Sequence, residues 1–368
     1  MLMISKKIVI VGTHATPALA LIEALKKREE WQIYYLGRRY TFEGKKIPST
    51  ESQIFPKHNI PFIAISSGRL QRKFTCWTIP SLLKIPFSVL VSLYFLMKIK
   101  PNVVCSFGGY SSVPVIISAW LLGIPSITHE QTTVAGLSNK INSLFVNKVA
   151  ITFPQSAKFF PPQKTILTGN PIRQSIFQTN HPLYNFPKKQ PLIYITGGNQ
   201  GAQIINQNVR KILPQLLSQY NIIHQCGQNN YQELKKQAEK LPTALKKNYF
   251  LVPYVNDQSI GWALSADLVI GRSGANTVLE LAALGKPAIL IPIPWSAHNE
   301  QTINGRFLVK NGGAIILPQE KLNPSSLMKN IKKVINNLNS YQKGAKKLQK
   351  HIKLDAAAAL IKEIYRLL

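Results

Sequence analysis

Hydrophobic and polar positions along this chain alternate between two patterns. Short apolar runs bounded by turn residues predict buried strands, and the segments between them have the apolar spacing of amphipathic helices. The runs lie at residues 7–11, 33–36, 103–106, 126–129 and 192–196. Strands that alternate with helices are typical of the α/β class with parallel sheets. At 368 residues the chain is too long for one ordinary core, so we expect two domains.

A second strand and helix series begins with LIYITGGNQGAQIINQNV, residues 192–209. We therefore place a first domain at residues 1–168 and a second at residues 169–349. The tail from residue 341 onward is amphipathic and helical in pattern, and we expect its last helix, about residues 350–368, to pack back on the first domain.

The most informative stretch is ADLVIGRSGANTVLELAALGKPAILIPIPWSAHNEQTINGR, residues 266–306. An apolar run at 268–270 ends in a Gly/Ser turn, and a helical pattern begins at Ala275. Backbone N–H groups and the helix dipole at such a start favour an anion, typically a phosphate. The carboxylate of Glu280, further along the helix, can accept two hydrogen bonds from a ribose diol.

A second buried strand, residues 288–293, follows and ends in a polar loop that contains His298, Asn299, Glu300 and Gln301. Together these features predict half of a nucleotide-sugar pocket. The alternative is an ordinary βαβ unit in which Glu280 is a solvated helix residue and Gln301 a loop amide.

Charge and composition narrow the function classes. A formal net charge of +30 favours phosphate-rich partners such as nucleic acid, anionic lipid or nucleotides, although a general bias toward lysine explains it equally well. Three cysteines without metal-ligand spacing suit a reducing compartment, and no Asp-x-Asp metal motif occurs. Two apolar stretches, 78–97 and 111–128, are interrupted by proline, lysine or glycine, so neither predicts a membrane span.

Several motifs occur in a characteristic order: HATP at 14–17, FGGY at 107–110, HEQ at 129–131, GNPIR at 169–173, GGNQGA at 197–202, and the 271–304 segment. In that order they resemble the MurG family of bacterial cell-wall glycosyltransferases. The block WLLGIPSITHEQTTVAGLSN, residues 120–139, is the most specific part of the resemblance.

The resemblance implies a GT-B glycosyltransferase fold, with two Rossmann-like domains and a cleft between them. It also implies an inverting enzyme that moves N-acetylglucosamine from UDP-N-acetylglucosamine to undecaprenyl-pyrophosphoryl-muramyl-pentapeptide, lipid I. The product would be lipid II of peptidoglycan biosynthesis, and the chemistry would need neither metal nor cofactor.

Site residues follow from the same resemblance. It places the uracil at the backbone of Tyr254 and Val255, and the ribose on Glu280. It places the diphosphate at Ala275, Asn276 and Thr277 with help from Asn199, and the sugar hydroxyls on Gln301. Arg173 of the GNPIR motif completes the donor set. The acceptor side would comprise Thr13, Gly108, Gly109, Tyr110, His129, Gln131 and Thr132.

The first turn departs from the family pattern. Family members carry a longer GGTGGH turn, whereas this chain reads Val11-Gly12-Thr13-His14 and has fewer glycines. Because a non-glycine residue pays a steric cost at positive φ, this turn is not expected to cradle phosphate in the same way. Asn199, Gln203 and Thr132 also replace family residues, but their side chains keep hydrogen-bonding capacity.

A general base has to accept the proton of the attacking hydroxyl. His14 is our first candidate, because an imidazole titrates near neutral pH and this one follows a strand end; Glu130 is the second. The structural alternatives are a histidine that only holds its loop, and a buried hydrogen-bonding pair at His129 and Glu130.

A lipid acceptor implies contact with a membrane, and residues 69–100 suit an anionic surface. Apolar residues there are interleaved with Arg72, Lys73 and Lys84; we assign to a membrane patch Trp77, Ile79, Leu82, Leu83 and Phe87. For residues 90–95 we expect an ordinary amphipathic helix packed in the first domain instead. The predicted location is peripheral, on the cytoplasmic face of the inner membrane.

Three alternatives remain open at this point. A different GT-B protein that uses UDP-sugars, such as a glycolipid glycosyltransferase or a UDP-N-acetylglucosamine 2-epimerase, would share the phosphate turn and Glu280. A nucleic-acid-binding protein is motivated by charge alone, since no recognisable module or aromatic-interleaved basic motif is present. A degenerate relative would account for the reduced first turn.

Overall fold

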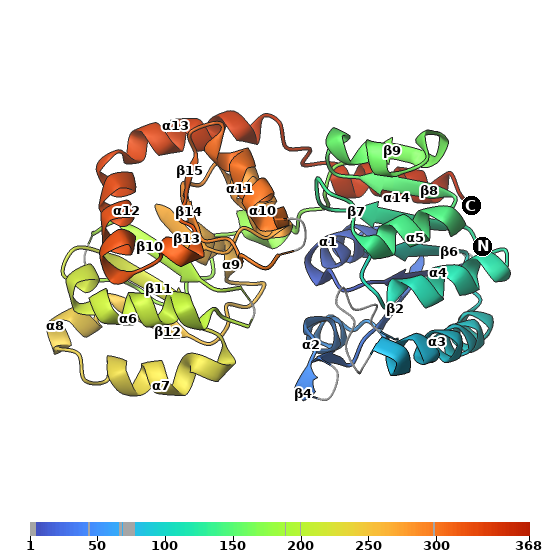
Figure 1. The fold of residues 1–368 in the computed structure, drawn as a ribbon, viewed down its shortest axis with the longest axis horizontal. Coiled ribbons are helices and arrows are strands. Elements are labelled where there is room, and N and C mark those ends of the chain that lie inside the picture. The colour runs from blue at the N-terminus through green and yellow to red at the C-terminus, as the bar shows by residue number, and fades with distance from the viewer. Residues whose placement is uncertain are drawn as a thin grey trace. The chain divides into compact units, whose positions relative to one another are not determined.

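The computed structural model describes residues 5–42, 45–65, 68, 78–187, 189–198, 200–296 and 299–368; for residues 41, 42, 45–47 and 78–83 it describes the backbone alone. The chain divides into two compact units, each with its own parallel sheet (Figure 1). Met1–Arg173 and Lys353–Leu368 form the first unit, and Gln174–Ile352 the second. The predicted α/β class with parallel sheets is confirmed.

The first unit contains a seven-stranded sheet in the order β5-β2-β1-β6-β7-β8-β9, with every neighbouring pair parallel. Its strands are β1 Lys6–Val11, β2 Trp31–Gly37, β5 Phe62–Ala64, β6 Val103–Ser106, β7 Ser126–Glu130, β8 Lys148–Ile151 and β9 Thr165–Leu167. A separate hairpin of β3 Tyr40–Phe42 and β4 Lys45–Pro48 follows β2. The parallel order brings the loops after β1, β2, β6 and β7 to one edge of the sheet.

Helices cover both faces of this sheet, because strand residues point alternately to opposite sides. On β1, Ile8 and Ile10 pack with α1 and α14, whereas Val9 and Val11 pack with α3 and α4. The helices of this unit are α1 Ala15–Lys26, α2 Thr50–Lys57, α3 Thr78–Ile99, α4 Ser112–Leu121, α5 Leu137–Phe145 and α14 Ala356–Tyr365.

The C-terminal helix α14 belongs to the first core although it follows the second unit in sequence (Figure 1). Its apolar face, Leu360, Ile361 and Ile364, is fully buried against α1. The Nε1–H of Trp31 donates to the Tyr365 hydroxyl at 3.0 Å, and the two rings meet edge to face. The single amphipathic tail of the sequence pattern is in fact two helices, separated at residues 350–355.

The second unit contains a six-stranded parallel sheet in the order β12-β11-β10-β13-β14-β15. Its strands are β10 Leu192–Thr196, β11 Asn221–Gln225, β12 Tyr249–Val252, β13 Leu268–Gly271, β14 Ala288–Leu290 and β15 Ala314–Ile316. Its helices are α6 Gln203–Leu217, α7 Gln228–Ala238, α8 Thr243–Lys246, α9 Ile260–Leu264, α10 Ala275–Leu284, α11 Glu300–Val309, α12 Pro324–Asn336 and α13 Leu338–Gln349.

The strand and helix predicted within 266–306 are confirmed, and α10 begins at Ala275 as expected. The following strand β14 is shorter than predicted, ending at Leu290. The N–H of Ile291 still donates to the carbonyl of Gly271, but Pro292 has no N–H with which to continue the ladder.

Residues 90–95 lie in α3, an amphipathic helix packed in the first unit, as predicted. Ser88, Ser92 and Leu96 form the buried face of α3, and the Ser118 hydroxyl of α4 donates to the Val89 carbonyl at 3.0 Å. Small serines let the two helices approach closely, so the large side chains of the same stretch face outward. The exposed large apolar side chains described on α3 are Phe87, Leu90, Tyr94 and Met97. In the described part of the chain, no helix is long and apolar enough to span a membrane.

Candidate active site

The turn after β1 is locked against the loop after β6. The N–H of Thr13 donates to the carbonyl of Gly108 at 3.1 Å. Gly109 has φ +84°, and a Cβ added there would lie 2.2 Å from Thr13 Oγ1, so only glycine fits. A Cβ added at Gly12 would lie 2.9 Å from the Gly108 carbonyl oxygen. The structure therefore brings together the predicted residues Thr13, His14, Gly108 and Gly109 at the carboxyl edge of the first sheet.

His14 is solvent-exposed at the start of α1. Its pKa is nonetheless lowered from 6.5, chiefly through desolvation by the surrounding protein; the Glu130 carboxylate opposes this shift and the Arg38 guanidinium adds to it. The imidazole is therefore neutral at pH 7, which is the form that can accept a proton.

Glu130, the second base candidate, is 3% exposed and accepts four hydrogen bonds. The donors are Thr132 N–H at 3.0 Å, Thr132 Oγ1 at 2.6 Å, Gly136 N–H at 3.0 Å and Asn139 Nδ2 at 3.0 Å. A carboxylate with so many donors holds the loop after β7 in shape. Thr132, predicted on the acceptor side, is one of its partners.

His129 and Gln131 lie on either side of Glu130 and are buried as well. The His129 Nε2 lies 2.8 Å from the Gly169 carbonyl, and its Nδ1 lies 3.2 Å from Gln131 Nε2. Burial lowers the pKa of His129 to about 4, so the ring is neutral. The HEQ motif thus links the ends of β7 and β9 through side chains that point into the unit.

In the second unit, the turn before α10 has the geometry of an anion site. Gly274 is the N-cap residue in extended conformation, and no side chain caps the helix. The first intrahelical bond runs from the Val278 N–H to the Gly274 carbonyl, so the N–H groups of Ala275, Asn276 and Thr277 precede the helical ladder. All three residues are partly exposed. An anion placed here would also meet the positive end of the helix dipole.

Glu280 is 8% exposed, so the alternative of a solvated helix residue does not hold. Gln301, on α11, accepts a hydrogen bond from the Ile293 N–H at 3.1 Å through its Oε1. This bond closes the polar loop between β14 and α11. His298 of that loop lies outside the described residues, and so does Asn199 of the Gly-rich turn.

Two polar residues beside the α10 turn were not predicted. Ser273 is fully buried, and among the described residues its Oγ has no hydrogen-bond partner. Asn304 is 3% exposed; its Nδ2 lies 3.5 Å from the Ser273 carbonyl and its Oδ1 has no partner there. Buried polar groups left unsatisfied are costly and often mark a functional site. Asn304 follows Gln301 by about one helical turn, so the two residues lie on the same face of α11. This spacing could have been recognised in the sequence.

Gln225, also not predicted, connects three parts of the donor side. Its Oε1 accepts from the Tyr194 hydroxyl at 2.7 Å and from the Val255 N–H at 3.3 Å, and its Nε2 donates to the Gly198 carbonyl at 3.0 Å. It is 3% exposed, whereas Tyr254 in the same loop is 37% exposed. One buried amide thus ties the Gly-rich turn to the loop predicted to contact uracil.

The remaining predicted residues lie as follows. Arg173 is the last residue of the first unit and is partly exposed. The backbone of Ile79, Leu82 and Leu83 is part of α3, but their side chains, like all of Trp77, lie outside the described residues. Phe87 is 60% exposed.

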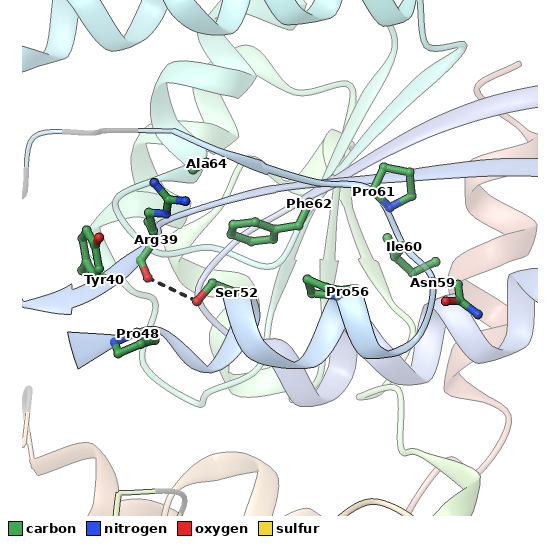
Figure 2. A pocket seen from close by; sticks show the side chains of 10 residues that line it. All are labelled: Arg39, Tyr40, Pro48, Ser52, Pro56, Asn59, Ile60, Pro61, Phe62 and Ala64. Atoms are coloured by element: carbon green, nitrogen blue, oxygen red, sulfur yellow. Dashed lines mark hydrogen bonds between the residues drawn. The ribbon is translucent and has the colours of Figure 1, made fainter. Parts of the chain in front are cut away.

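A pocket of about 900 Å³ lies beside the first sheet, between α2, β5 and the β3–β4 hairpin (Figure 2). It is lined by Arg39, Tyr40, Pro48, Ser52, Pro56, Asn59, Ile60, Pro61, Phe62 and Ala64. None of the predicted site residues lines it.

Within the described ranges, no three His, Cys, Asp or Glu side chains are grouped as a metal site would require.

Comparison with known proteins agrees with this geometry. The glycosyltransferase family 28 N-terminal domain model matches residues 8–151, and the corresponding C-terminal domain model matches residues 192–360. A UDP-N-acetylglucosamine--N-acetylmuramyl-(pentapeptide) pyrophosphoryl-undecaprenol N-acetylglucosamine transferase of Clostridium perfringens is 37% identical over 333 residues, 89% of this chain and 88% of the relative. A Bacillus cereus protein of the same description is 35% identical over 351 residues, 93% and 95% of the two chains.

Solved structures share the fold over the full length. MurG of Acinetobacter baumannii superposes with a TM-score of 0.68 at 27% identity, covering 98% of this chain and 99% of its own. A UDP-GlcNAc 2-epimerase from Neisseria meningitidis, bound to UDP-GlcNAc, superposes with a TM-score of 0.65 at 15% identity, covering 98% and 100%. At that identity the second likeness is one of fold alone.

The two parallel α/β units, together with the likeness to MurG, show the GT-B glycosyltransferase fold. The chain belongs to glycosyltransferase family 28 and, within it, to the MurG family. The resemblance drawn from the sequence motifs is confirmed.

We predict that Glu130→Gln lowers the free energy of unfolding by about 2–3 kcal/mol in urea denaturation, because an amide in that place leaves charge-assisted donors poorly paired. Glu233→Gln is the matched control. That glutamate is 64% exposed in its ion pair with Arg210, and its loss should cost no more than about 1 kcal/mol. Equal stabilities of the two variants would show that the Glu130 carboxylate does not hold its loop.

Proposed function

We propose that the protein transfers N-acetylglucosamine from UDP-N-acetylglucosamine to the muramyl sugar of undecaprenyl-pyrophosphoryl-muramyl-pentapeptide. The observation that carries this is similarity along nearly the whole chain to transferases described by that reaction, together with the uncapped α10 turn. In the proposed reaction, the acceptor hydroxyl oxygen forms a bond to the anomeric carbon. The bond from that carbon to the diphosphate breaks with inversion, and UDP leaves.

The second unit would hold the donor. The uracil would lie against the backbone of Tyr254 and Val255, in a loop that Gln225 holds in place. Glu280 would accept hydrogen bonds from the ribose, and Gln301 would contact the sugar. Asn199 would complete the set in this unit, and Arg173, the last residue of the first unit, is the remaining residue proposed for the donor.

The leaving diphosphate gains negative charge as the bond breaks. Backbone N–H groups of Ala275, Asn276 and Thr277 are fixed before the reaction, so they stabilise this charge without reorganisation. The positive end of the α10 dipole adds to the effect. We therefore expect transfer to need no divalent metal.

The first unit would hold the acceptor at the turn of residues 12–14 and the loop of 108–110. His14 would accept the hydroxyl proton, because its imidazole is exposed and neutral at pH 7. Glu130 serves as a positioning residue in this scheme. Its four hydrogen bonds would have to break before it could act as a base. His129, Gln131 and Thr132 would shape the acceptor loops from behind.

The membrane partner is proposed on the exposed side chains of α3, α4 and α5. These neighbouring helices cover one face of the first sheet, and their exposed apolar residues include Phe87, Leu90, Tyr94, Met97, Trp120, Leu121 and Leu144. An apolar surface of this kind on a basic protein suits an anionic bilayer surface. The protein would attach peripherally, at the cytoplasmic face of the inner membrane.

The proposed reaction is tested with radiolabelled UDP-N-acetylglucosamine and a short-chain lipid I analogue. The wild type should label the acceptor. Glu280→Ala should raise the KM for the donor at least about tenfold, because a carboxylate bonded to the ribose is lost. Glu320→Ala, an exposed glutamate elsewhere in the second unit, should change nothing. Conversion of the donor to its 2-epimer without acceptor labelling would favour the epimerase alternative.

His14→Ala should lower kcat by about 10²- to 10⁴-fold while the affinity for UDP stays unchanged, because only proton acceptance is lost. In the wild type, the acid limb of the kcat/KM profile should lie below pH 6.5, since the folded protein lowers the pKa of this imidazole from that value. Near-normal turnover of His14→Ala would remove His14 from the mechanism.

Membrane attachment is tested by co-sedimentation with vesicles that contain phosphatidylglycerol. The double variant Leu90→Glu with Tyr94→Glu should lose most of the binding at moderate salt, because two exposed apolar contacts become anionic. Val309→Glu, at an exposed position of the second unit, should bind like the wild type. If all three proteins bind equally, α3 is not the attachment surface.

A further inference from the structure

Arg38 is a cation built rigidly into the carboxyl edge of the first sheet. It follows β2, and its Nε donates to Glu51 Oε1 at 2.8 Å. The Ser49 hydroxyl, at the N-cap of α2, donates to the Arg38 carbonyl at 2.6 Å. Both the backbone and the side chain of Arg38 are thus attached to the start of α2.

The guanidinium also reaches the loop after β6. Its central carbon lies 5.7 Å from the centre of the Tyr110 ring, a cation–π distance. In the sheet, β1 lies between β2 and β6. A side chain that connects the ends of β2 and β6 therefore passes over the end of β1, where His14 is located. The contribution of Arg38 to the pKa of His14 agrees with this placement.

The ion pair is asymmetric in its exposure. The Glu51 side chain is fully buried, whereas a fifth of the Arg38 side chain is open to solvent. Burying an ion pair for stability alone gains little, because desolvation offsets the attraction. The carboxylate holds the guanidinium in one orientation, at the edge where parallel sheets bind their ligands, and part of the Arg38 side chain reaches solvent there.

The neighbouring turn after β1, residues 11–14, supplies few groups that bind an anion. The N–H of Thr13 is already used by the Gly108 carbonyl, and the turn has a single glycine at Gly12. An acceptor with a diphosphate group needs positive charge here, and a guanidinium matches phosphate oxygens with two parallel hydrogen bonds.

We propose that Arg38, oriented by Glu51 and Tyr110, binds the diphosphate of the lipid acceptor and so places the acceptor hydroxyl beside His14. This inference rests on the proposed function. The next residue, Arg39, lies in a different environment. Its side chain lines the pocket beside α2, and its carbonyl accepts a hydrogen bond from the Ser52 hydroxyl at 3.2 Å (Figure 2).

The test compares two adjacent arginines in the transfer assay. Arg38→Gln should raise the KM for the lipid I analogue about 10- to 100-fold, the loss expected for hydrogen bonds between charged groups, with the KM for UDP-N-acetylglucosamine unchanged. Arg38→Lys should recover part of the affinity. Arg39→Gln, which removes the same charge one residue away, should match the wild type.

Removing Arg38 alone leaves the Glu51 carboxylate buried without its cation, which destabilises the folded protein. A second variant therefore separates loss of acceptor binding from loss of folding. Arg38→Gln combined with Glu51→Gln replaces the ion pair by two neutral amides of similar shape and should fold. It should show the same rise in the KM for the acceptor. The acid limb of its kcat/KM profile should move to higher pH, because Arg38 no longer lowers the pKa of His14.

Direct binding gives a readout independent of turnover. In calorimetric titration with the donor site saturated by UDP, the wild type and Arg39→Gln should bind farnesyl diphosphate more tightly than farnesol. Arg38→Gln, and the double variant Arg38→Gln with Glu51→Gln, should lose that difference. An unchanged acceptor KM in these variants, or a fall in kcat alone, would overturn the role of Arg38. Absence of any transfer by the wild type would instead contradict the proposed function.

Discussion

Parallel strands bring all their carboxyl ends to one edge of a sheet, and every functional group described above depends on that constraint. In the first unit, β2, β1, β6 and β7 are consecutive neighbours, so the residues that follow them converge. Arg38, His14, Tyr110 and Glu130 come from four separate stretches of sequence for this reason. In the second unit, the same geometry brings the Gly-rich turn after β10 to the α10 turn after β13, because those strands are paired.

Fixed polar contacts hold these edges in shape. Glu130 organises the loop after β7, Gln225 connects two donor-side loops, and Glu51 orients Arg38. Each is buried and hydrogen-bonded, and each supports a more exposed group that would meet substrate. Such support matters in catalysis, because groups aimed at developing charge act best when they need no reorganisation. The two units thus place rigid support beneath accessible binding groups.

The sequence predicted the regular part of this molecule well. The apolar runs assigned as strands coincide with observed strands, most of them to within two residues at either end, and the Gly/Ser turn located the start of α10 at Ala275. Those signals are local, because a few neighbouring residues determine where apolar and polar positions alternate and where a helix begins. The order of the motifs along the chain also predicted the family. The proposed roles of the site residues remain predictions.

Burial and long-range contacts were less accessible to sequence reasoning. The pattern of residues 90–95 predicted a packed amphipathic helix but not which face is buried. Ser88 and Ser92 take the inward positions of α3, and Leu90 and Tyr94 are exposed. Gln225 and Arg38 have no local motif, since their partners lie in other strands or helices. Glu280 could not be distinguished from a solvated residue until its burial was known.

The proposed function requires the carboxyl edge of the second sheet to bind a nucleoside diphosphate through the start of α10. Calorimetric titration of the wild type with UDP and with uridine, both in excess EDTA, tests this requirement. We expect UDP to bind at least about tenfold more tightly than uridine without any divalent metal, because the backbone N–H groups and helix dipole recognise the diphosphate. Equal affinities, or UDP binding that appears only when metal is restored, would contradict it.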